Sequence, residues 1–331
     1  ASDAEQALAI SGETPFSREA VSEPTFENAN APGIMWGILI TPEDDVVKTG
    51  IANFTSMFTS LCFGYGGYTT IVGTWKKINV LLYDQIGEND VRKGWWLDEN
   101  YQSSLLDTYH ESGLADELFN AWFGVPYSPD YGPFWAVMGM EPYTHVKFGP
   151  ENKNPLDPNN STDFPLMRAE EMVLIRAEAT AMGGDPGAGK TILEDFVTTY
   201  RDPDYVCEAT SPTGIQDEVW MQRRIEFWGE GISWFDIMRL KKPIIRKEDG
   251  VTNFGAQAIF NIPAETSYML WPIPQEEIQA NDGISDAQNN QMGTLPVSDP
   301  VSSAIAKSGV VDSYTLPGLE KSTSGFSKAT R

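Results

Sequence analysis

Residues 184–191 read GDPGAGKT, which matches the consensus of a phosphate-binding P-loop. In that motif the loop follows a buried β-strand, and its backbone N–H groups converge with a lysine on the phosphates. Here residues 168–182 precede the glycines, with apolar side chains at helical rather than alternating spacing: Met172, Ile175, Ala179 and Met182. A helix leads into this loop, so its context does not favour a nucleotide site.

The same residues have the signals of a turn between two helices. Gly183 and Gly184 can end the first helix in a left-handed conformation. Asp185 and Pro186 then suit the N-cap and first turn of the next helix. Lys190 falls one turn inside that second helix, where its side chain projects sideways. The pattern predicts a helical hairpin with Lys190 exposed at the surface and no affinity for ATP or GTP.

A second group with possible chemistry lies in residues 218–240, where charged side chains alternate with Trp and Phe. Glu226 and Glu230, one helical turn apart, could serve as the acid and base of a glycoside hydrolase. The alternative is a buried structural network, because charges among so many aromatics must pair. We favour this second interpretation, and the expected members are Arg224, Glu226, Glu230 and Asp236.

Aromatic residues interrupted by Gly and Pro fill residues 63–135. Sugar rings present apolar C–H faces that stack on flat aromatics, and hydroxyls that bond planar polar groups. Most large aromatics in a domain belong to its core. The candidates for a shallow glycan site are Tyr65, Tyr68, Trp75, Trp122, Tyr127, Tyr131 and Trp135.

Metal and cofactor signals are weak. His110 and His145 have no partners at metal-ligand spacing, so no metal site or cofactor is predicted. An oxygen-rich loop could hold calcium, although its composition is more typical of a plain turn; it contains Asp157, Asn159, Asn160 and Asp163. Cys62 and Cys207 could form one disulfide or remain two thiols.

Composition limits the class of partner. The chain has 331 residues, with 23 Lys and Arg against 47 Asp and Glu, for a net charge of -24. Such a field repels nucleic acid and anionic lipid headgroups. No apolar run approaches the roughly 20 residues that a membrane-spanning helix needs, so any attachment to a membrane would require a lipid anchor that this chain lacks.

The elements that would position these residues are mostly helices. We expect a helix ending at Gly12, a strand within residues 28–41, helices through most of 165–240, and a short strand before Pro272 followed by a helical turn. The chain is expected to form a single domain over 1–281, followed by an extended polar tail over 282–331.

Four motifs in order resemble the C-terminal signature of the SusD/RagB family: RAEEMVLIRAEA with GGDP, QRRIEFWGEGISWFDIMRL, WPIPQEEIQAN and QNN. Gln222 and Ser233 differ from the residues usual in that pattern. The resemblance covers roughly residues 165–290, and AEQALAISG with APGIMWGI is similar to the region after the family's tetratricopeptide-like helices.

The resemblance implies a mainly α-helical, SusD-like fold, with helical hairpins of the tetratricopeptide type, a loop-rich C-terminal region and few short strands. It implies a non-catalytic outer-membrane lipoprotein that binds a nutrient, most often a glycan, at the cell surface. Its expected partners are an oligosaccharide or polysaccharide and a SusC-like TonB-dependent transporter. The charged motifs of the family are structural, in agreement with the network proposed above.

Overall fold

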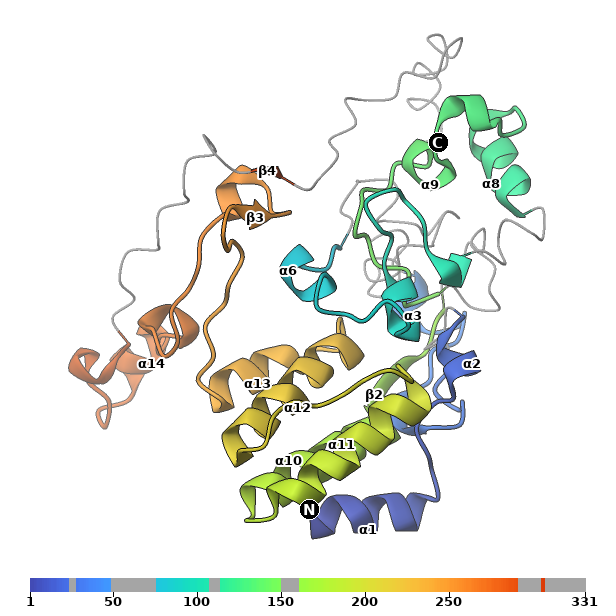
Figure 1. The fold of residues 1–331 in the computed structure, drawn as a ribbon. Helices are drawn as coiled ribbons and strands as arrows, with labels where there is room; N and C mark the ends of the chain where they lie inside the picture. Colours follow the sequence, from blue (N-terminus) through green and yellow to red (C-terminus); the bar gives the residue numbers. More distant parts are fainter. Residues whose placement is uncertain (24–27, 49–75, 107–113, 150–160, 291–304, 307–331) are drawn as a thin grey trace. The chain divides into compact units, whose positions relative to one another are not determined.

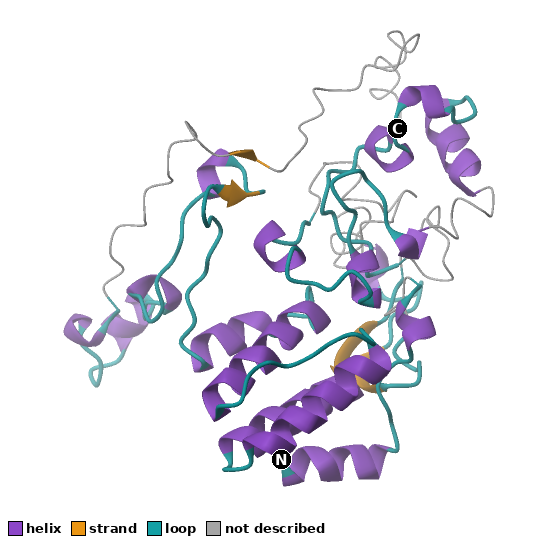
Figure 2. Ribbon diagram, in the orientation of Figure 1, coloured by secondary structure: helices purple, strands orange, loops and turns teal. Residues whose placement is uncertain are grey.

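The computed structural model describes residues 1–23, 28–48, 76–106, 114–149, 161–290 and 305–306. These residues form mostly helices with two small two-stranded sheets (Figures 1 and 2), which confirms the predicted fold class. They fall into two compact units. Unit 1 contains the described residues of 1–78 and 82–222, and unit 2 contains residues 79–81 and those of 223–306. The single domain predicted over 1–281 stays a prediction.

The first part of unit 1 contains short elements. They are α1 (Ser2–Ser11), α2 (Arg18–Val21), β1 (Ile34–Ile38), α3 (Asp45–Lys48), α6 (Val80–Tyr83), which begins in unit 2, η2 (Val91–Trp95), η3 (Ser104–Leu106), α8 (Leu114–Phe123), η4 (Pro129–Tyr131) and α9 (Phe134–Val137), where η marks a 3-10 helix. As predicted, the first helix ends at Gly12, which takes φ 72.

Longer helices follow in the second half of the chain. The elements are β2 (Phe164–Arg168), α10 (Ala169–Met182), α11 (Pro186–Tyr200), α12 (Pro212–Glu226), α13 (Ser233–Arg239), β3 (Val251–Thr252), η6 (Ala256–Ala258), η7 (Ser267–Met269), α14 (Gln275–Ala280), η8 (Asp286–Gln288) and β4 (Ile305–Ala306). The last residues of α12 belong to unit 2.

Helices α10 and α11 form the predicted hairpin and lie side by side in Figure 1. Asp185 caps α11 by accepting a hydrogen bond from the Ala188 amide at 2.9 Å. Gly184, at φ 111, supplies the left-handed residue of the turn, whereas Gly183 keeps φ -79. Gly189 permits the close approach of the helices, because a Cβ there would lie 2.6 Å from Ala181 Cβ.

Lys190 corrects one detail of the sequence interpretation. Its side chain is 29% exposed, so it is only partly at the surface. The ammonium donates to the Cys207 carbonyl and lies 3.7 Å from the Glu194 carboxylate. Glu194 also accepts from the Cys207 amide at 3.1 Å. The lysine of the P-loop-like sequence therefore fixes the loop after α11.

Cys207 is a free, fully buried thiol. Burial raises the pKa of this thiol, which keeps it protonated and unreactive at neutral pH. Cys62, its possible disulfide partner, lies outside the described residues.

The strand predicted within 28–41 is β1, and it pairs antiparallel with β2, which the sequence interpretation missed. The register places Ile34 opposite Arg168 and Ile38 opposite Phe164. Asp163, just before β2, accepts from the Ala29 amide at 2.9 Å and from the Ile40 amide at 2.7 Å. This carboxylate therefore fixes both ends of β1.

One buried carboxylate organises the core of unit 1. Glu170, at the start of α10, is fully buried and accepts from Arg201 at 2.9 Å and from the Phe16 amide at 2.8 Å. Arg168 lies 3.0 Å from its other oxygen. Arg201 also donates to the Phe16 carbonyl at 2.9 Å. The cluster joins the N-terminal segment, β2, α10 and the end of α11.

In unit 2, the strand expected before Pro272 is absent. Residues 267–269 form the 3-10 turn η7, and the predicted helical turn that follows is α14. The sequence interpretation was wrong here because the side chain of Asn290, not a neighbouring strand, satisfies this backbone. Asn290 donates to the Ser267 carbonyl at 2.8 Å and to the Leu270 carbonyl at 2.7 Å.

Candidate functional site

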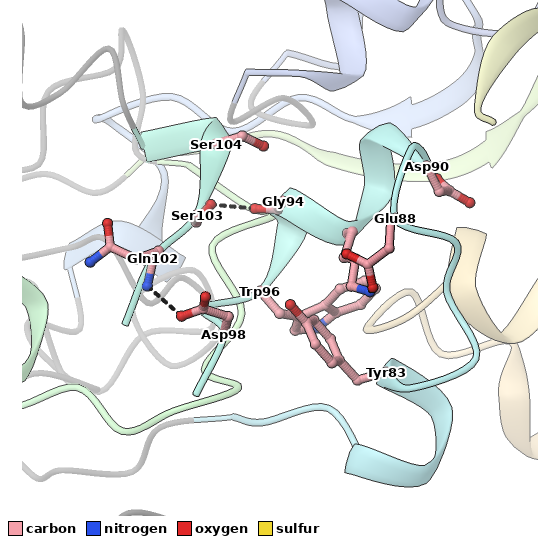
Figure 3. Close-up of a pocket in the computed structure, with 10 residues that line it drawn as sticks. Tyr83, Glu88, Asp90, Gly94, Trp96, Asp98, Gln102, Ser103 and Ser104 are labelled. Atoms are coloured by element: carbon pink, nitrogen blue, oxygen red, sulfur yellow. Dashed lines mark hydrogen bonds and ion pairs between the residues drawn. The ribbon is translucent and has the colours of Figure 1, made fainter. Parts of the chain in front are cut away.

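A cavity of about 360 Å³ opens in unit 1 between Tyr83 at the end of α6, η2 and the loop that leads to η3, all in the first third of the chain. The buried side chains of Tyr83 and Trp96 lie together there, with carboxylate, amide and hydroxyl groups around them (Figure 3). Lys93 adds an ammonium group to the lining. The lining residues are Tyr83, Glu88, Asp90, Lys93, Gly94, Trp96, Asp98, Gln102, Ser103 and Ser104.

The wall at η2 is built around a charged pair. Asp90 caps η2 by accepting from the Arg92 amide at 2.9 Å, and the same carboxylate binds the Arg92 guanidinium, with Nη2 2.6 Å from Oδ2. Gly94 occupies the closest approach of η2 to η3. A Cβ at this position would lie 2.5 Å from the Ser104 hydroxyl oxygen. A side chain at position 94 would therefore displace the Ser104 hydroxyl from its present place in the cavity lining.

The floor is fixed by backbone pairing. Trp95 and Trp96 are fully buried, and the Trp95 indole donates to the Val21 carbonyl at 2.9 Å. The Leu97 amide donates to the Thr144 carbonyl at 3.0 Å, and the Tyr143 amide donates back to Leu97 at 2.9 Å. Trp96 and Leu97, which directly follow η2, are thus held against 143–146, with the Trp96 backbone extended and the residue lining the cavity.

A tight loop from Asp98 to Gln102 forms the other wall. Asp98 Oδ1 accepts from the Asn100 amide at 2.7 Å and the Gln102 amide at 2.8 Å. Tyr101, inside this loop, takes a left-handed φ of 64, which is costly for a bulky residue. Its buried ring compensates by anchoring the loop. Such conformations persist only where the surroundings impose them, often near functional sites.

Tyr83 connects the floor to this wall. Its ring meets Tyr143 edge to face, with ring centroids 5.2 Å apart, and the Lys93 ammonium lies 5.4 Å from its ring centroid. Burial raises the pKa of Tyr83 strongly, and the carboxylates of Asp98, Glu88 and Asp84 raise it further. The phenol is therefore neutral at physiological pH, and its O–H is available as a donor and acceptor.

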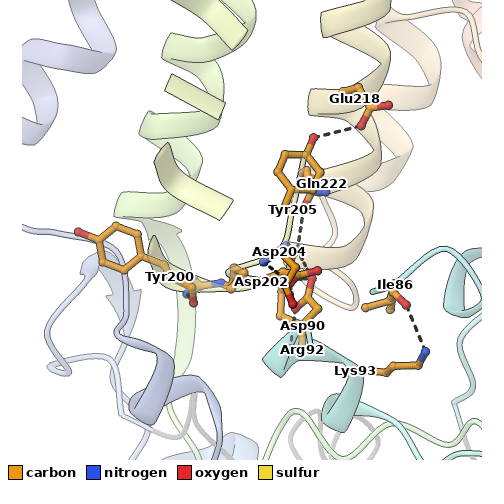
Figure 4. A network of polar contacts seen from close by, with 11 residues as sticks. Ile86, Asp90, Arg92, Lys93, Tyr200, Asp202, Asp204, Tyr205, Glu218 and Gln222 are labelled. Atoms are coloured by element: carbon orange, nitrogen blue, oxygen red, sulfur yellow. Dashed lines mark hydrogen bonds and ion pairs between the residues drawn. The ribbon is translucent and has the colours of Figure 1, made fainter. Parts of the chain in front are cut away.

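Polar contacts attach this region to the helical part of unit 1 (Figure 4). Arg92 donates to the Gln222 side chain at 2.6 Å. The Val91 amide donates to the Arg201 carbonyl at 3.1 Å, and Asn89 donates to Asp204 at 2.6 Å. The segment that begins the cavity wall is thus fixed to the loop after α11 and to α12. Gln222 is one of the two departures from the family pattern noted in the sequence.

The aromatic residues predicted as glycan-binding candidates differ in whether the structure describes them and in how exposed they are. Tyr65, Tyr68 and Trp75 lie outside the described residues, as does the side chain of Trp122. Trp135 is only 3% exposed. The remaining two, Tyr127 and Tyr131, are half-buried and pack against Phe119, with ring centroids 5.4 and 5.6 Å away. Their role in ligand binding stays a prediction.

Sequence interpretation missed the polar wall of the cavity. Glu88, Asp98 and Gln102 lie in the predicted region but were not among the candidates. The signal that could have found them is the DENYQ sequence of residues 98–102, because an Asp followed two residues later by Asn favours a side-chain-supported turn. Nothing in that pattern shows that Tyr83 and Trp96 lie beside the turn.

The charged residues of 223–239 are placed in unit 2. Glu226 and Asp236 are buried, and Arg224 and Glu230 are half-buried. Asp236 accepts from Arg223 at 2.7 Å and from Arg239 at 2.9 Å. Burial lowers the pKa of the Arg224 guanidinium. The network of four predicted from sequence stays a prediction, and Arg223 and Arg239 are the partners that this structure gives Asp236.

Among the described residues, no group of three His, Cys, Asp or Glu side chains could hold a metal ion. Asp157, Asn159 and Asn160 of the possible calcium loop lie outside those residues, and Asp163 instead binds the two backbone amides beside β1. None of the helices described is both long and apolar enough to span a membrane.

The sequence model of the SusD family matches residues 75–291, which is more than half of the chain and includes the whole cavity. This chain belongs to the SusD family. None of the curated proteins compared with it matches.

Solved structures agree with this assignment. A SusD-like carbohydrate-binding protein from Bacteroides vulgatus has a TM-score of 0.56 at 17% identity, over 88% of this chain and 56% of that protein. A SusD superfamily protein from Bacteroides thetaiotaomicron gives 0.55 at 18% identity, over 87% and 56%. At such identity the likeness shows the fold alone. The chain spans little more than half the length of these solved relatives.

Proposed function

We propose that this SusD-family chain binds a glycan without catalysis, in the cavity between Tyr83, Trp96 and Asp98, and that it delivers the glycan to a TonB-dependent outer-membrane transporter. The observation that carries the binding proposal is the combination in one cavity of the Asp98 carboxylate and the exposed Gln102 amide with the accessible edge of the Tyr83 ring. Sugars are recognised by this combination of apolar and planar polar groups. The carbohydrate-binding relative from Bacteroides vulgatus supports the same ligand class.

The rim residues have distinct roles in this proposal. Asp98 Oδ1 is held by two backbone amides, so its Oδ2 can accept from sugar hydroxyls. The exposed Gln102 amide can donate and accept, although its nitrogen also reaches the Asn100 carbonyl at 3.2 Å. The aromatic residues of 63–135 predicted from sequence would extend this surface toward a longer glycan.

Binding is tested with a panel of soluble polysaccharides in affinity gel electrophoresis, followed by calorimetry on any glycan that retards the protein. Asp98→Ala should weaken binding about tenfold, because truncation removes a charge-assisted hydrogen bond. Asp282→Ala, a change at an exposed residue of unit 2, is the matched control. Unchanged affinity in Asp98→Ala would place the glycan elsewhere, and no binding across the panel would reject the function.

Delivery to a transporter and attachment to the outer membrane are the finer parts of the proposal. They are supported by the family assignment and by the need for a partner to move cargo across a membrane. The test is affinity purification of the full-length protein from the outer membrane of the organism that encodes it. Recovery without a co-purifying barrel, in detergents that preserve such complexes, would contradict this part.

The alternative of a glycoside hydrolase receives less support. Glu226, one of its two proposed carboxylates, is fully buried, whereas a general acid or base must reach the substrate. Incubation of a bound glycan with the protein should therefore leave its chain length unchanged, which reducing-end assays can measure.

A further inference from the structure

We infer that the cavity selects neutral glycans and rejects those that carry carboxylate or sulfate groups. This inference rests on the proposed function, because it concerns the same site and names the class of ligand that the site accepts. It follows from which charges line the cavity and from how each of them is already bound.

The rim carries an excess of negative charge. Three carboxylates line the cavity, those of Glu88, Asp90 and Asp98, against one ammonium group, that of Lys93. Asp84 lies close enough to raise the pKa of Tyr83, together with Asp98 and Glu88, although burial is the largest cause. Lys93 pairs with Glu88 and Arg92 pairs with Asp90, so the negative field that an anionic sugar would enter comes mainly from Asp98 and Asp84.

The basic side chains near the cavity already form ion pairs with carboxylates of the protein. Lys93 forms an ion pair with Glu88 and donates to the Ile86 carbonyl at 3.2 Å. Arg92 is fully buried and holds Asp90 and Gln222. Arg or Lys side chains that can turn their donors toward the ligand are the groups that most favour binding of a carboxylate or sulfate. Among the described residues that line the cavity, only Lys93 is basic, and Glu88 already neutralises it.

Asp98 is the residue that we expect to discriminate between neutral and anionic glycans. Two backbone amides hold its Oδ1 in place, so the carboxylate cannot rotate away from an incoming anion. Toward a neutral sugar the same oxygen atoms accept hydrogen bonds from hydroxyls. Repulsion of the wrong ligand and attraction of the right one thus come from one side chain.

The experiment compares polysaccharides that share a backbone and differ in charge. Suitable pairs are hydroxyethyl and carboxymethyl cellulose, dextran and dextran sulfate, and methyl-esterified and de-esterified pectin, measured by affinity electrophoresis in about 150 mM salt, where exposed charges farther than about 8 Å are screened. We expect the neutral member of at least one pair to bind, and its anionic counterpart to bind at least about tenfold more weakly.

Variants separate the cavity from the charge of the whole chain. Asp98→Asn keeps an oxygen for the two backbone amides, and Glu88→Gln leaves Lys93 without its ionic partner. Each of these two variants should reduce the ratio of the affinity for the neutral polysaccharide to that for the anionic one by about threefold or more. Asp282→Asn removes the same unit of charge from an exposed position in unit 2 and should leave this ratio unchanged. Thermal unfolding confirms that each variant is folded.

The possible results distinguish the inference from the function on which it rests. Equal binding of both members of a pair overturns the inference and leaves glycan binding standing. An affinity ratio that Asp98→Asn and Glu88→Gln do not change, or that Asp282→Asn changes equally, assigns the selectivity to overall charge and also overturns it. If neither member of any pair binds, the proposed function fails, and the inference fails with it.

Discussion

Gly189 allows α10 and α11 to pack closely. A Cβ at this position would lie 2.6 Å from Ala181 Cβ, 2.7 Å from Ala181 N and 2.8 Å from the Ala177 carbonyl oxygen. All three atoms belong to the backbone or to a rigid methyl group, so the helices must separate to admit a side chain. Gly189→Ala should therefore destabilise the protein by about 1 to 3 kcal/mol, as overpacking does, in urea unfolding.

Gly187 is the matched control in the same helix. It is exposed, and a Cβ there would meet only Asp185 Oδ1, at 3.7 Å. Gly187→Ala should stabilise the protein by about 0.5 to 1 kcal/mol, through helix propensity alone. Opposite signs for the two substitutions identify packing as the cause. Equal effects would show that the contact with α10 does not limit residue size at position 189.

At the scale of elements, Asp236 joins the end of α12 to α13. It is buried, and it binds Arg223, which is 5% exposed, and Arg239, which is 42% exposed. Asp236→Ala should cost about 3 to 5 kcal/mol, because it leaves the charge of Arg223 buried without this carboxylate. Arg239→Ala should cost about 1 kcal/mol or less, as for exposed pairs. Both free energies of unfolding are measured in urea. If Asp236→Ala loses as little stability as Arg239→Ala, Asp236 does not have the proposed structural role.

The edge-to-face contact between Tyr83 and Tyr143, both in unit 1, predicts that the stability of the protein decreases at alkaline pH. Burial raises the pKa of Tyr143 to about 12 from its ordinary value of 10, and Glu99, Asp84 and Asp98 add to the shift. Because the folded pKa is the higher one, this contribution to stability is complete below about pH 10 and is lost as the pH rises toward 12.

The free energy of unfolding, measured in urea at about pH 9.5 and pH 11.5, should therefore decrease with pH. Tyr143→Phe, which cannot ionise, should lose less stability over the same interval. If the wild type and Tyr143→Phe lose equal stability, ionisation of other groups accounts for the effect.

For the whole molecule, the net charge of -24 dominates the long-range electrostatics. Repulsion among so many like charges destabilises the compact state. Salt weakens this repulsion, because at 0.1 M exposed charges more than about 10 Å apart are largely screened from one another. The midpoint of thermal unfolding should rise by about 1 to 3 °C between low salt and about 0.3 M NaCl. KCl at equal ionic strength should act alike, since screening does not depend on the ion. A decrease would mean that exposed ion pairs outweigh the repulsion.

The sequence by itself determined the helices and the family. The helix before GDPGAGKT, the N-cap of the next helix at Asp185 and the end of α1 at Gly12 follow from spacing and capping residues. These are local signals, because a helix satisfies its hydrogen bonds between residues four apart. The net charge of -24 also follows from the residue counts alone. The family motifs needed only their order along the chain.

Tertiary structure alone decided which distant groups meet. Strand β2 forms because β1 lies beside it, although 125 residues separate Ile38 from its partner Phe164. The strand expected before Pro272 does not form, because Asn290 satisfies its carbonyls instead. Lys190 binds the Cys207 carbonyl, a contact that no motif indicates. In the cavity, Tyr83 and Asp98 lie together because backbone pairing of 95–97 with 143–146 places them there. Such contacts depend on loop closure and burial over the whole chain, and local residue patterns do not encode them.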